Sequence, residues 1–281
     1  MTDSAIAISC VVPAYQSASM IARCLASILA QTGITPEIVV VDDSSTLDVR
    51  ACVDALAVHH PQIRYAAGAR TGRPADNWNL GLERARGRYV VLVHHDETLI
   101  DPLYLRRAVD RLDAGGGGLL VASHELAGDG GRSRFALVAG LARRLRLPPW
   151  TLYGANWLGP TASVVFSPRA DVRFDPDLTW LVDVDFYARL LAGRQALLRD
   201  DAVSVRSLRH PDQITARIHP RRLALMETRS LAGRPDRGLR GWRGGVLILY
   251  AALRVPPWRW FDNDSRPAPA GAMATRWRIP R

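Results

Sequence analysis

Strand signals and helical patterns alternate along the first 123 residues of the chain. Largely apolar runs at 6–12, 37–41, 63–67, 88–93 and 119–123 predict buried strands. Between these runs, apolar residues recur at helical spacing over 21–29, 47–58, 75–86 and 102–112. Strands that alternate with helices predict an α/β fold with a mostly parallel central sheet flanked by helices.

The pattern is weaker in the second half of the chain. Residues 124–150 combine glycines with an arginine-rich segment, which indicates an insertion or a short amphipathic helix. A strand is predicted at 161–166, a helix at 182–191 and a further strand at 196–205. We expect one folded domain over 1–231 and a distinct C-terminal tail over 232–281.

The C-terminal tail is basic and rich in tryptophan. It holds ten Arg, three Asp and no Glu, so most of the net charge of +10 lies there, together with four of the eight Trp. Tryptophans and arginines around the apolar run 246–253 are typical of a segment that lies in the membrane interface against anionic lipid. A C-terminal helix packed on the domain, with a disordered end, explains the same pattern.

Composition narrows the functional class only slightly. Hydrophobic residues make up 48% of the 281 residues and charged residues 23%, as in ordinary soluble globular proteins. All 37 cationic residues are Arg, whose guanidinium suits phosphate groups, although genome composition explains this bias as well. No recognition module for nucleic acid accompanies the charge, and we expect no nucleic-acid partner.

Cysteine spacing and apolar segments bear on localisation. The three cysteines show neither metal-ligand spacing nor a paired framework, which favours a reducing compartment. We find no basic leader segment, and no apolar run approaches the roughly 20 residues that span a bilayer. The sequence predicts a cytoplasmic protein, peripheral at the inner face of the cell membrane if the tail binds lipid.

Three polar clusters follow predicted strands. Pro13-Ala14-Tyr15 follows the first strand, Asp42-Asp43-Ser44-Ser45 the second, and His94-His95-Asp96-Glu97 the fourth. Ligands bind at the carboxyl ends of the strands in an open parallel sheet. Each cluster alone would be a common turn or helix cap, but together they predict one binding site at that edge.

In the order and spacing of these motifs, the sequence resembles the inverting family-2 type glycosyltransferases with the GT-A fold. The resemblance implies a nucleotide-sugar half over about 1–123 and an acceptor half over about 124–231. It covers residues 7 to about 215 and is carried by Val11–Tyr15, Val39–Ser45 and Asn77–Glu97, and more weakly by Gly159-Pro160, Asp183–Leu190 and Arg209–Pro211.

For the donor, the resemblance assigns nucleotide contacts to residues near the strand ends. Asp43 would accept a hydrogen bond from the base, and Arg73 would face the base or the diphosphate. The base would be lined by Pro13, Ala14 and Tyr15.

The resemblance also implies a divalent metal, Mn²⁺ or Mg²⁺, that bridges the two phosphates. Asp96 matches the final acid of the family's Asp-x-Asp motif and would hold the metal, and His210 would complete the site. His94 and His95 stand at the first two positions of the motif, where they would contact ribose or phosphate or, as imidazole ligands, favour Mn²⁺. A solvated loop histidine is the alternative interpretation of His210.

For the transfer step, Asp183 matches the second acid of the family's Glu-Asp pair, and Val182 replaces the Glu. Asp183 would be the general base that takes the proton from the acceptor hydroxyl. Trp180 and Asp185 would bind the acceptor, with Trp180 as an apolar platform for a sugar ring. The competing interpretation is an acidic first helical turn for Asp183 and Asp185 and a core position for Trp180.

The sequence therefore predicts a metal-dependent inverting glycosyltransferase. It would move a sugar from a nucleoside-diphosphate sugar to a glycan or lipid-linked acceptor in cell-surface polysaccharide or glycolipid biosynthesis. The missing Glu and the His-for-Asp exchange leave one alternative open, a catalytically degenerate domain of the same fold that binds a nucleotide sugar or a partner.

Overall fold

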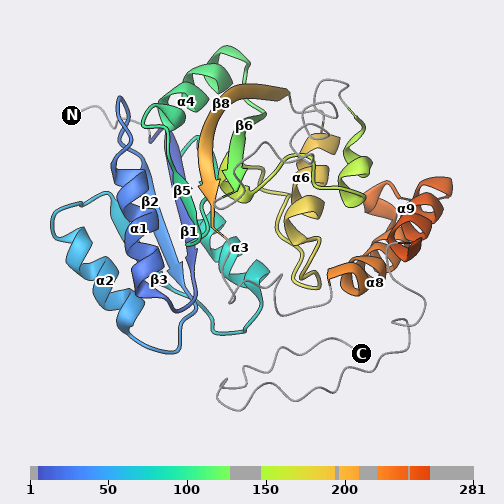
Figure 1. The fold of residues 1–281 in the computed structure, drawn as a ribbon, viewed down its shortest axis with the longest axis horizontal. Coiled ribbons are helices and arrows are strands. Elements are labelled where there is room, and N and C mark those ends of the chain that lie inside the picture. Colours follow the sequence, from blue (N-terminus) through green and yellow to red (C-terminus); the bar gives the residue numbers. More distant parts are fainter. Residues whose placement is uncertain (1–5, 127–146, 194–195, 209–219, 240, 254–281) are drawn as a thin grey trace.

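The structure is a computed structural model that describes residues 6–126, 147–193, 196–208, 220–239 and 241–253 (Figure 1). In the first half, each predicted strand and helix is present within three residues of its expected bounds, and the short strand β5 is an addition. The elements are β1 (Ile8–Ala14), α1 (Ala18–Leu29), β2 (Glu37–Asp42), α2 (Asp48–Ala57), β3 (Ile63–Ala67), α3 (Pro74–Arg84), β4 (Tyr89–Leu92), β5 (Glu97–Leu99), α4 (Tyr104–Ala114) and β6 (Leu119–Leu126).

The second half departs further from the prediction. The start of the expected strand 161–166 is a 3₁₀ turn, because Ser163 donates to the Pro160 carbonyl at 3.0 Å from its backbone N–H. Most of the segment expected as an insertion, 127–146, lies outside the described residues. The elements are η1 (Pro149–Tyr153), η2 (Thr161–Ser163), β7 (Val164–Phe166), α6 (Val182–Ala192), β8 (Leu197–Ser207), α8 (Pro220–Ala232), η3 (Pro235–Arg237) and α9 (Trp242–Leu253).

The described strands form one sheet in the order β3-β2-β1-β4-β7-β6-β8-β5. Strands β3, β2, β1 and β4 are parallel, as are β6 and β8, which confirms the mostly parallel sheet. Strand β7 is antiparallel to both β4 and β6, and β5 is antiparallel to β8. The hydrophobic pattern predicted β7 without its direction, because burial on both faces is the same for either direction.

Each face of the sheet carries its own hydrophobic core. Along β1, Val11 belongs to the core that α3 and α6 cover, whereas Cys10 and Val12 belong to the core under α1 and α4. Successive side chains of a strand point to opposite faces, so a strand covered on both sides is apolar throughout. This burial explains the run of apolar residues from which β1 was predicted.

Helices α8 and α9 lie at the end of the molecule opposite α1 and α2, next to α6 (Figure 1). Leu239 and Leu247, beyond the predicted domain boundary at 231, are buried in the same core as Val11. The Trp242 ring meets the Trp150 ring edge to face, with centroids 5.6 Å apart. Over residues 242–253 the tail is therefore a helix packed on the domain, and the division at 231 stays a prediction.

Candidate functional site

The first two polar clusters meet at the carboxyl ends of neighbouring strands. Ala14 and Asp42 are paired in the register of β1 and β2, and Asp42 pairs in turn with Ala67 at the end of β3. The backbone N–H of Asp43 donates to the Ala14 carbonyl at 3.0 Å. Sheet pairing thus brings Tyr15 and Asp43 to one edge.

Pro13 and Ala14 lie within β1 and are buried, whereas the sequence placed them in a loop after the strand. Proline is tolerated here because the ladder between β1 and β4 ends at Val11, so β1 continues at Pro13 only along β2. Tyr15, which follows the strand, is partly exposed. Of the three residues expected at the base, Tyr15 is therefore the accessible one.

The Asp43 carboxylate is held by the loop that leads into α3. The Arg70 backbone N–H donates to Asp43 Oδ1 at 2.5 Å, and the Gly72 N–H donates to the same carboxylate. Burial raises the pKa of Asp43. Gly68 is required beside it, because a Cβ on residue 68 would lie 2.7 Å from Asp43 Oδ1. The guanidinium of Arg73 is half exposed and donates to Asp76 at 2.8 Å.

In the cluster after β4, Glu97 is buried and the other three side chains are partly exposed. Glu97 is buried, and its Oε2 accepts bonds from the His94 N–H at 2.9 Å and the Thr161 hydroxyl at 2.9 Å. Burial, and then the charge of Asp96, raise the pKa of Glu97 to about 8. The His94 ring packs on Trp78 at 4.9 Å between centroids, and burial lowers the pKa of His94 to about 4, so it is neutral at pH 7. His95 and Asp96, like His94, are partly exposed.

The side chains at these positions supply few ligands for a divalent metal. Among the described residues, no group of three His, Cys, Asp or Glu side chains is arranged to hold a metal ion. Mg²⁺ is commonly held by one or two carboxylates together with the phosphates of a substrate, and Asp96 supplies one carboxylate. The residues fit a cation shared with a diphosphate and do not form a cage of protein ligands alone. His210 lies outside the described residues.

One loop, 156–163, connects the Asp96 region to Asp183. At one end, Glu97 accepts the hydroxyl of Thr161. At the other end, the Asn156 side chain donates to Asp183 Oδ2 at 3.1 Å and to the Gly159 carbonyl at 3.0 Å. The loop therefore brings the two predicted halves of the site into one assembly.

Asp183 occupies the first turn of α6, at the start of the helix as expected. Its Oδ1 accepts the Val184 N–H at 2.8 Å, and its carboxylate is partly buried. Burial raises the pKa of Asp183 to about 6. A carboxylate with this pKa is largely ionised at pH 7 and basic enough to accept a proton from a bound hydroxyl.

Asp185, two residues further on, has a different environment. It is fully buried and accepts the Tyr153 hydroxyl at 2.9 Å and the Arg189 guanidinium at 2.8 Å. A second guanidinium, that of Arg237, lies 2.7 Å from its Oδ1. Both carboxylate oxygens of Asp185 are thus engaged by protein groups, and its acceptor-binding role stays a prediction.

Trp180 is partly buried and packs against the core that includes Phe174, while its backbone N–H donates to Glu227. Glu227 and Asn156 are contacts of the site that sequence reasoning missed. Asn156 is an isolated polar residue in a mainly apolar segment, and Glu227 is one of several polar residues of α8; both are weak signals, and neither partner is near in sequence. Such contacts form only when α6 packs against α8 and the loop 156–163, so the sequence alone does not reveal them.

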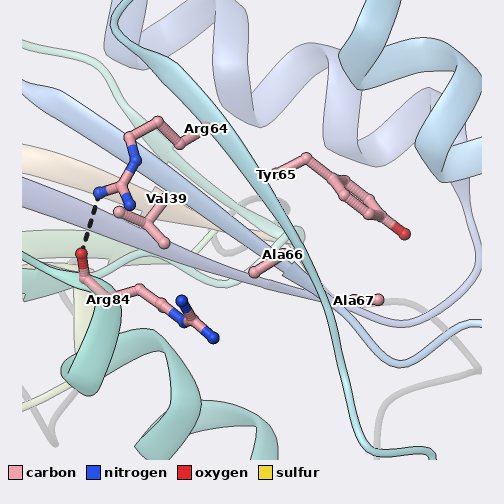
Figure 2. Close-up of a pocket in the computed structure, with 6 residues that line it drawn as sticks. All are labelled: Val39, Arg64, Tyr65, Ala66, Ala67 and Arg84. Carbon is pink, nitrogen blue, oxygen red and sulfur yellow. Dashed lines mark hydrogen bonds between the residues drawn. The ribbon is translucent and has the colours of Figure 1, made fainter.

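A separate recess lies beside the edge strand β3, on the side that α3 covers (Figure 2). Figure 2 shows the Arg64 guanidinium bonded to the Arg84 carbonyl, a distance of 3.0 Å. Arg64 also donates to Glu37 at 2.5 Å. None of the residues that line the recess is among the predicted site residues, so the recess does not enlarge the site.

Comparison with known sequences identifies related proteins. The family model described as Glycosyl transferase family 2 matches residues 9–177. The succinoglycan biosynthesis protein ExoO of Rhizobium meliloti (strain 1021) is 35% identical over 200 residues, which cover 66% of this chain and 57% of ExoO. The chain thus spans little more than half the length of that relative.

Comparison with solved structures adds two similar folds. Residues 1–349 of S. aureus TarS, in complex with UDP-GlcNAc, superpose with a TM-score of 0.62 at 16% identity, covering 86% of this chain and 70% of that one. The mannosyltransferase PcManGT from Pyrobaculum calidifontis, in complex with GDP-Man and Mn²⁺, gives a TM-score of 0.60 at 17% identity, covering 88% and 73%. At these identities the likeness establishes the fold alone.

Proposed function

Because the chain belongs to glycosyl transferase family 2, we propose that it transfers a sugar from a nucleoside-diphosphate sugar to an acceptor hydroxyl, with inversion at the anomeric carbon. The fold is the GT-A fold that its structural neighbours share. The observation that carries the proposal is the link between Asp183 and the Asp96 region through the loop 156–163. Asp183 and the phosphate-facing carboxylate of Asp96, whose surroundings this loop joins, suit attack on one face of a sugar and departure from the other.

Asp183 is the proposed general base. The Asn156 amide and the Val184 N–H hold one oxygen each, which fixes the plane of the carboxylate. An acceptor hydroxyl loses its proton to Asp183 as its oxygen attacks the anomeric carbon, and the bond to the diphosphate breaks on the opposite face. The configuration therefore inverts. Proton transfer to a positioned base contributes typically about 10²- to 10⁴-fold in rate.

The proposed donor site lies where β1, β2 and β4 end. Tyr15 is accessible for contact with a base, and Asp43 is held in place by the Arg70 loop. Arg73, half exposed and bonded to Asp76, is free to exchange that carboxylate for a diphosphate. TarS is in complex with UDP-GlcNAc and PcManGT with GDP-Man, which supports a nucleoside-diphosphate sugar without selecting the base.

Divalent metal use is part of the proposal. Asp96 would hold Mn²⁺ or Mg²⁺, with His95 beside it and His210 as a further ligand. The Asp96 carbonyl accepts the Leu208 N–H at 2.9 Å, which holds the chain two residues before His210 at Asp96. When bound, such an ion neutralises the charge that develops on the leaving diphosphate. The Mn²⁺ in the PcManGT complex supports this assignment.

A thermal-shift screen of UDP, GDP, dTDP and CMP sugars, each with and without Mn²⁺, tests the donor site. We expect one nucleotide class to raise Tm by about 5–10 °C at a hundredfold excess over Kd, since ligand that binds only the folded state stabilises it by about 2.7 kcal/mol. Mn²⁺ alone should give no shift, because Asp96 by itself is a weak site. Asp96→Asn should remove the Mn²⁺ increment and Asp113→Asn, a control at an exposed ion pair with Arg88, should retain it. A shift with Mn²⁺ alone would contradict the shared-cation site.

The biosynthetic role is proposed from the ExoO relative, whose description names succinoglycan biosynthesis. We propose a glycan or lipid-linked acceptor in cell-surface polysaccharide or glycolipid synthesis, and a cytoplasmic enzyme bound to the inner face of the membrane. No helix among the described residues is long and apolar enough to cross a bilayer. On α9, Trp242, Val246 and Leu249 are 66%, 49% and 60% exposed at positions that share one helix face. This face would enter the lipid interface.

Flotation with vesicles of anionic lipid tests the membrane proposal. We expect wild-type protein to float with anionic vesicles and not with neutral vesicles, and the pair Trp242→Ser with Leu249→Ser to reduce flotation several-fold. Val203→Ser, a change at a similarly exposed apolar residue of β8, is the control. A variant truncated after residue 253 measures separately how much the arginine-rich segment 254–281 contributes to flotation. Equal flotation of all variants and wild type would show that the tail and α9 do not bind lipid.

A further inference from the structure

Helix α6 begins without a side-chain cap from its N-cap residue. Its N-cap residue, Leu181, has no side chain that could accept a hydrogen bond from the first turn. The first N–H groups of a helix, and of the turn before it, have no partner within the helix and need acceptors when they are buried. In the first turn of α6, Asp183 accepts the Val184 N–H, whereas the acceptor for the turn before the helix comes from a residue 46 positions further along the chain.

The acceptor is the carboxylate of Glu227 on α8. Its Oε1 accepts the Thr179 N–H at 2.7 Å, its Oε2 accepts the Leu181 N–H at 2.7 Å, and the Trp180 N–H lies 3.1 Å from both oxygens. Glu227 is only 6% exposed. Bonds from N–H groups to a charged carboxylate are about twice as strong as neutral ones, and a negative charge is favoured at a helix N-terminus. One side chain thus fixes three successive peptide groups.

The turn that Glu227 holds carries residues of the proposed site. Trp180, the proposed platform for an acceptor sugar, lies in the middle of it, and Asp183 follows two residues after Leu181. Asp183 is faced by Asn156 from the preceding loop, Tyr187 from its own helix and Glu227 from α8. Glu227 is the charged group of this set, and its charge adds to the effect of burial on the pKa of Asp183.

We propose that Glu227 is a positioning residue of the transfer site, which sets the placement of Trp180 and Asp183 and the charge environment of the base. This inference rests on the proposed function. Glu227 lies beyond residue 177, where the family match ends, so the match does not cover it. Helix α8 is therefore part of the transfer machinery and not only a cover for the core.

The test compares Glu227→Gln, which removes the charge, with Glu227→Asp, which keeps the charge and shortens the side chain. Met226→Gln, a change at a half-exposed neighbour on the same helix, is the control. With Glu227→Gln, we expect kcat/KM for the acceptor to fall by about 10- to 100-fold, because small misplacement of a base or acceptor has effects of this size. The nucleotide-induced thermal shift should not change.

The pH profile separates positioning from simple capping. Removing a negative charge beside Asp183 lowers its pKa. With Glu227→Gln, the acid limb of kcat should therefore move below the midpoint of about 6 that is expected for wild type. With Glu227→Asp, which keeps the charge, the midpoint should remain at the wild-type value. A loss of activity that leaves the limb in place in both variants would reduce Glu227 to a structural cap. Wild-type kinetics in Glu227→Gln would overturn the proposal entirely.

Amide hydrogen exchange of the wild-type protein tests the anchor without a variant. We expect slow exchange at Thr179, Trp180 and Leu181 when Glu227 is bound to them. Exchange at the rate of an unstructured peptide would overturn the proposal even if neither Glu227 variant folded. If wild-type protein transfers no sugar, the proposed function fails, and the exchange data still decide whether Glu227 anchors this turn.

Discussion

Replacement of Asp183 by Asn should lower kcat for sugar transfer by about 10²- to 10⁴-fold while nucleotide-sugar binding is retained. Asn has the size of Asp and can keep the bond from the Val184 N–H through its carbonyl oxygen, so the helix start is preserved, while the bond from Asn156 to the other oxygen is lost. What it lacks is the capacity to take a proton. Radiolabelled transfer measures the loss, and the donor-induced thermal shift reports binding.

The pH dependence of the wild-type enzyme gives the same assignment an independent check. Burial raises the pKa of Asp183 to about 6, and a base acts only when deprotonated, so kcat should fall as the pH drops through about 6 and level off above it. Asp177→Asn, an exposed acid on the same stretch of chain, should keep both rate and profile. NMR of the product should show inversion, since retention would require an enzyme nucleophile. If wild-type protein binds a donor and transfers nothing, the degenerate binding domain is the correct interpretation.

The sequence predicted that Asp43 and Asp96 lie at one edge of the sheet because the signals there are local. Asp43 and Asp96 follow strands whose apolar runs are unmistakable, and parallel pairing then places them at one edge whatever else the chain does. The boundary error at Pro13 has the same origin. A proline marks the end of a ladder on one side of a strand, and sequence alone does not reveal that β1 continues along β2.

The acceptor side could not be read in this way because its contacts are distant in sequence. Glu227 caps a turn 46 residues away, and Arg237 reaches Asp185 across a similar separation. His94 shows the reverse problem. Its position in a polar cluster predicted contact with a ligand and gave no sign that its ring also packs on Trp78 of α3. Whether a polar side chain is buried or exposed depends on tertiary packing, which a local sequence pattern does not show.

Asp185→Asn should destabilise the fold by about 3 kcal/mol, with a fall in Tm of about 6–12 °C. Residues two apart on a helix point to nearly opposite sides, so Asp183 can face the site while Asp185 faces Tyr153 and Arg237 in the interior. Without the carboxylate, the guanidinium of Arg237, only 9% exposed, loses a buried counter-charge. Its remaining partners are Asp175, which is buried, and Asp236, which is exposed. Breaking one side of a buried pair is costly because the other charge stays desolvated.

Asp54→Asn is the matched control, because Asp54 and Arg50 form a helical ion pair of the same spacing as Asp185 and Arg189, with both partners about half exposed. Solvent screens the exposed pair, and its loss should leave Tm within the scatter of the measurement. Acceptor KM, measured for Asp185→Asn at a temperature where it is fully folded, then decides the remaining question. A large rise in KM would support the acceptor-binding role predicted for Asp185. An unchanged KM with a lowered Tm would assign the two acids of α6 to separate tasks, Asp183 to proton transfer and Asp185 to the packing of α6 on the C-terminal segment.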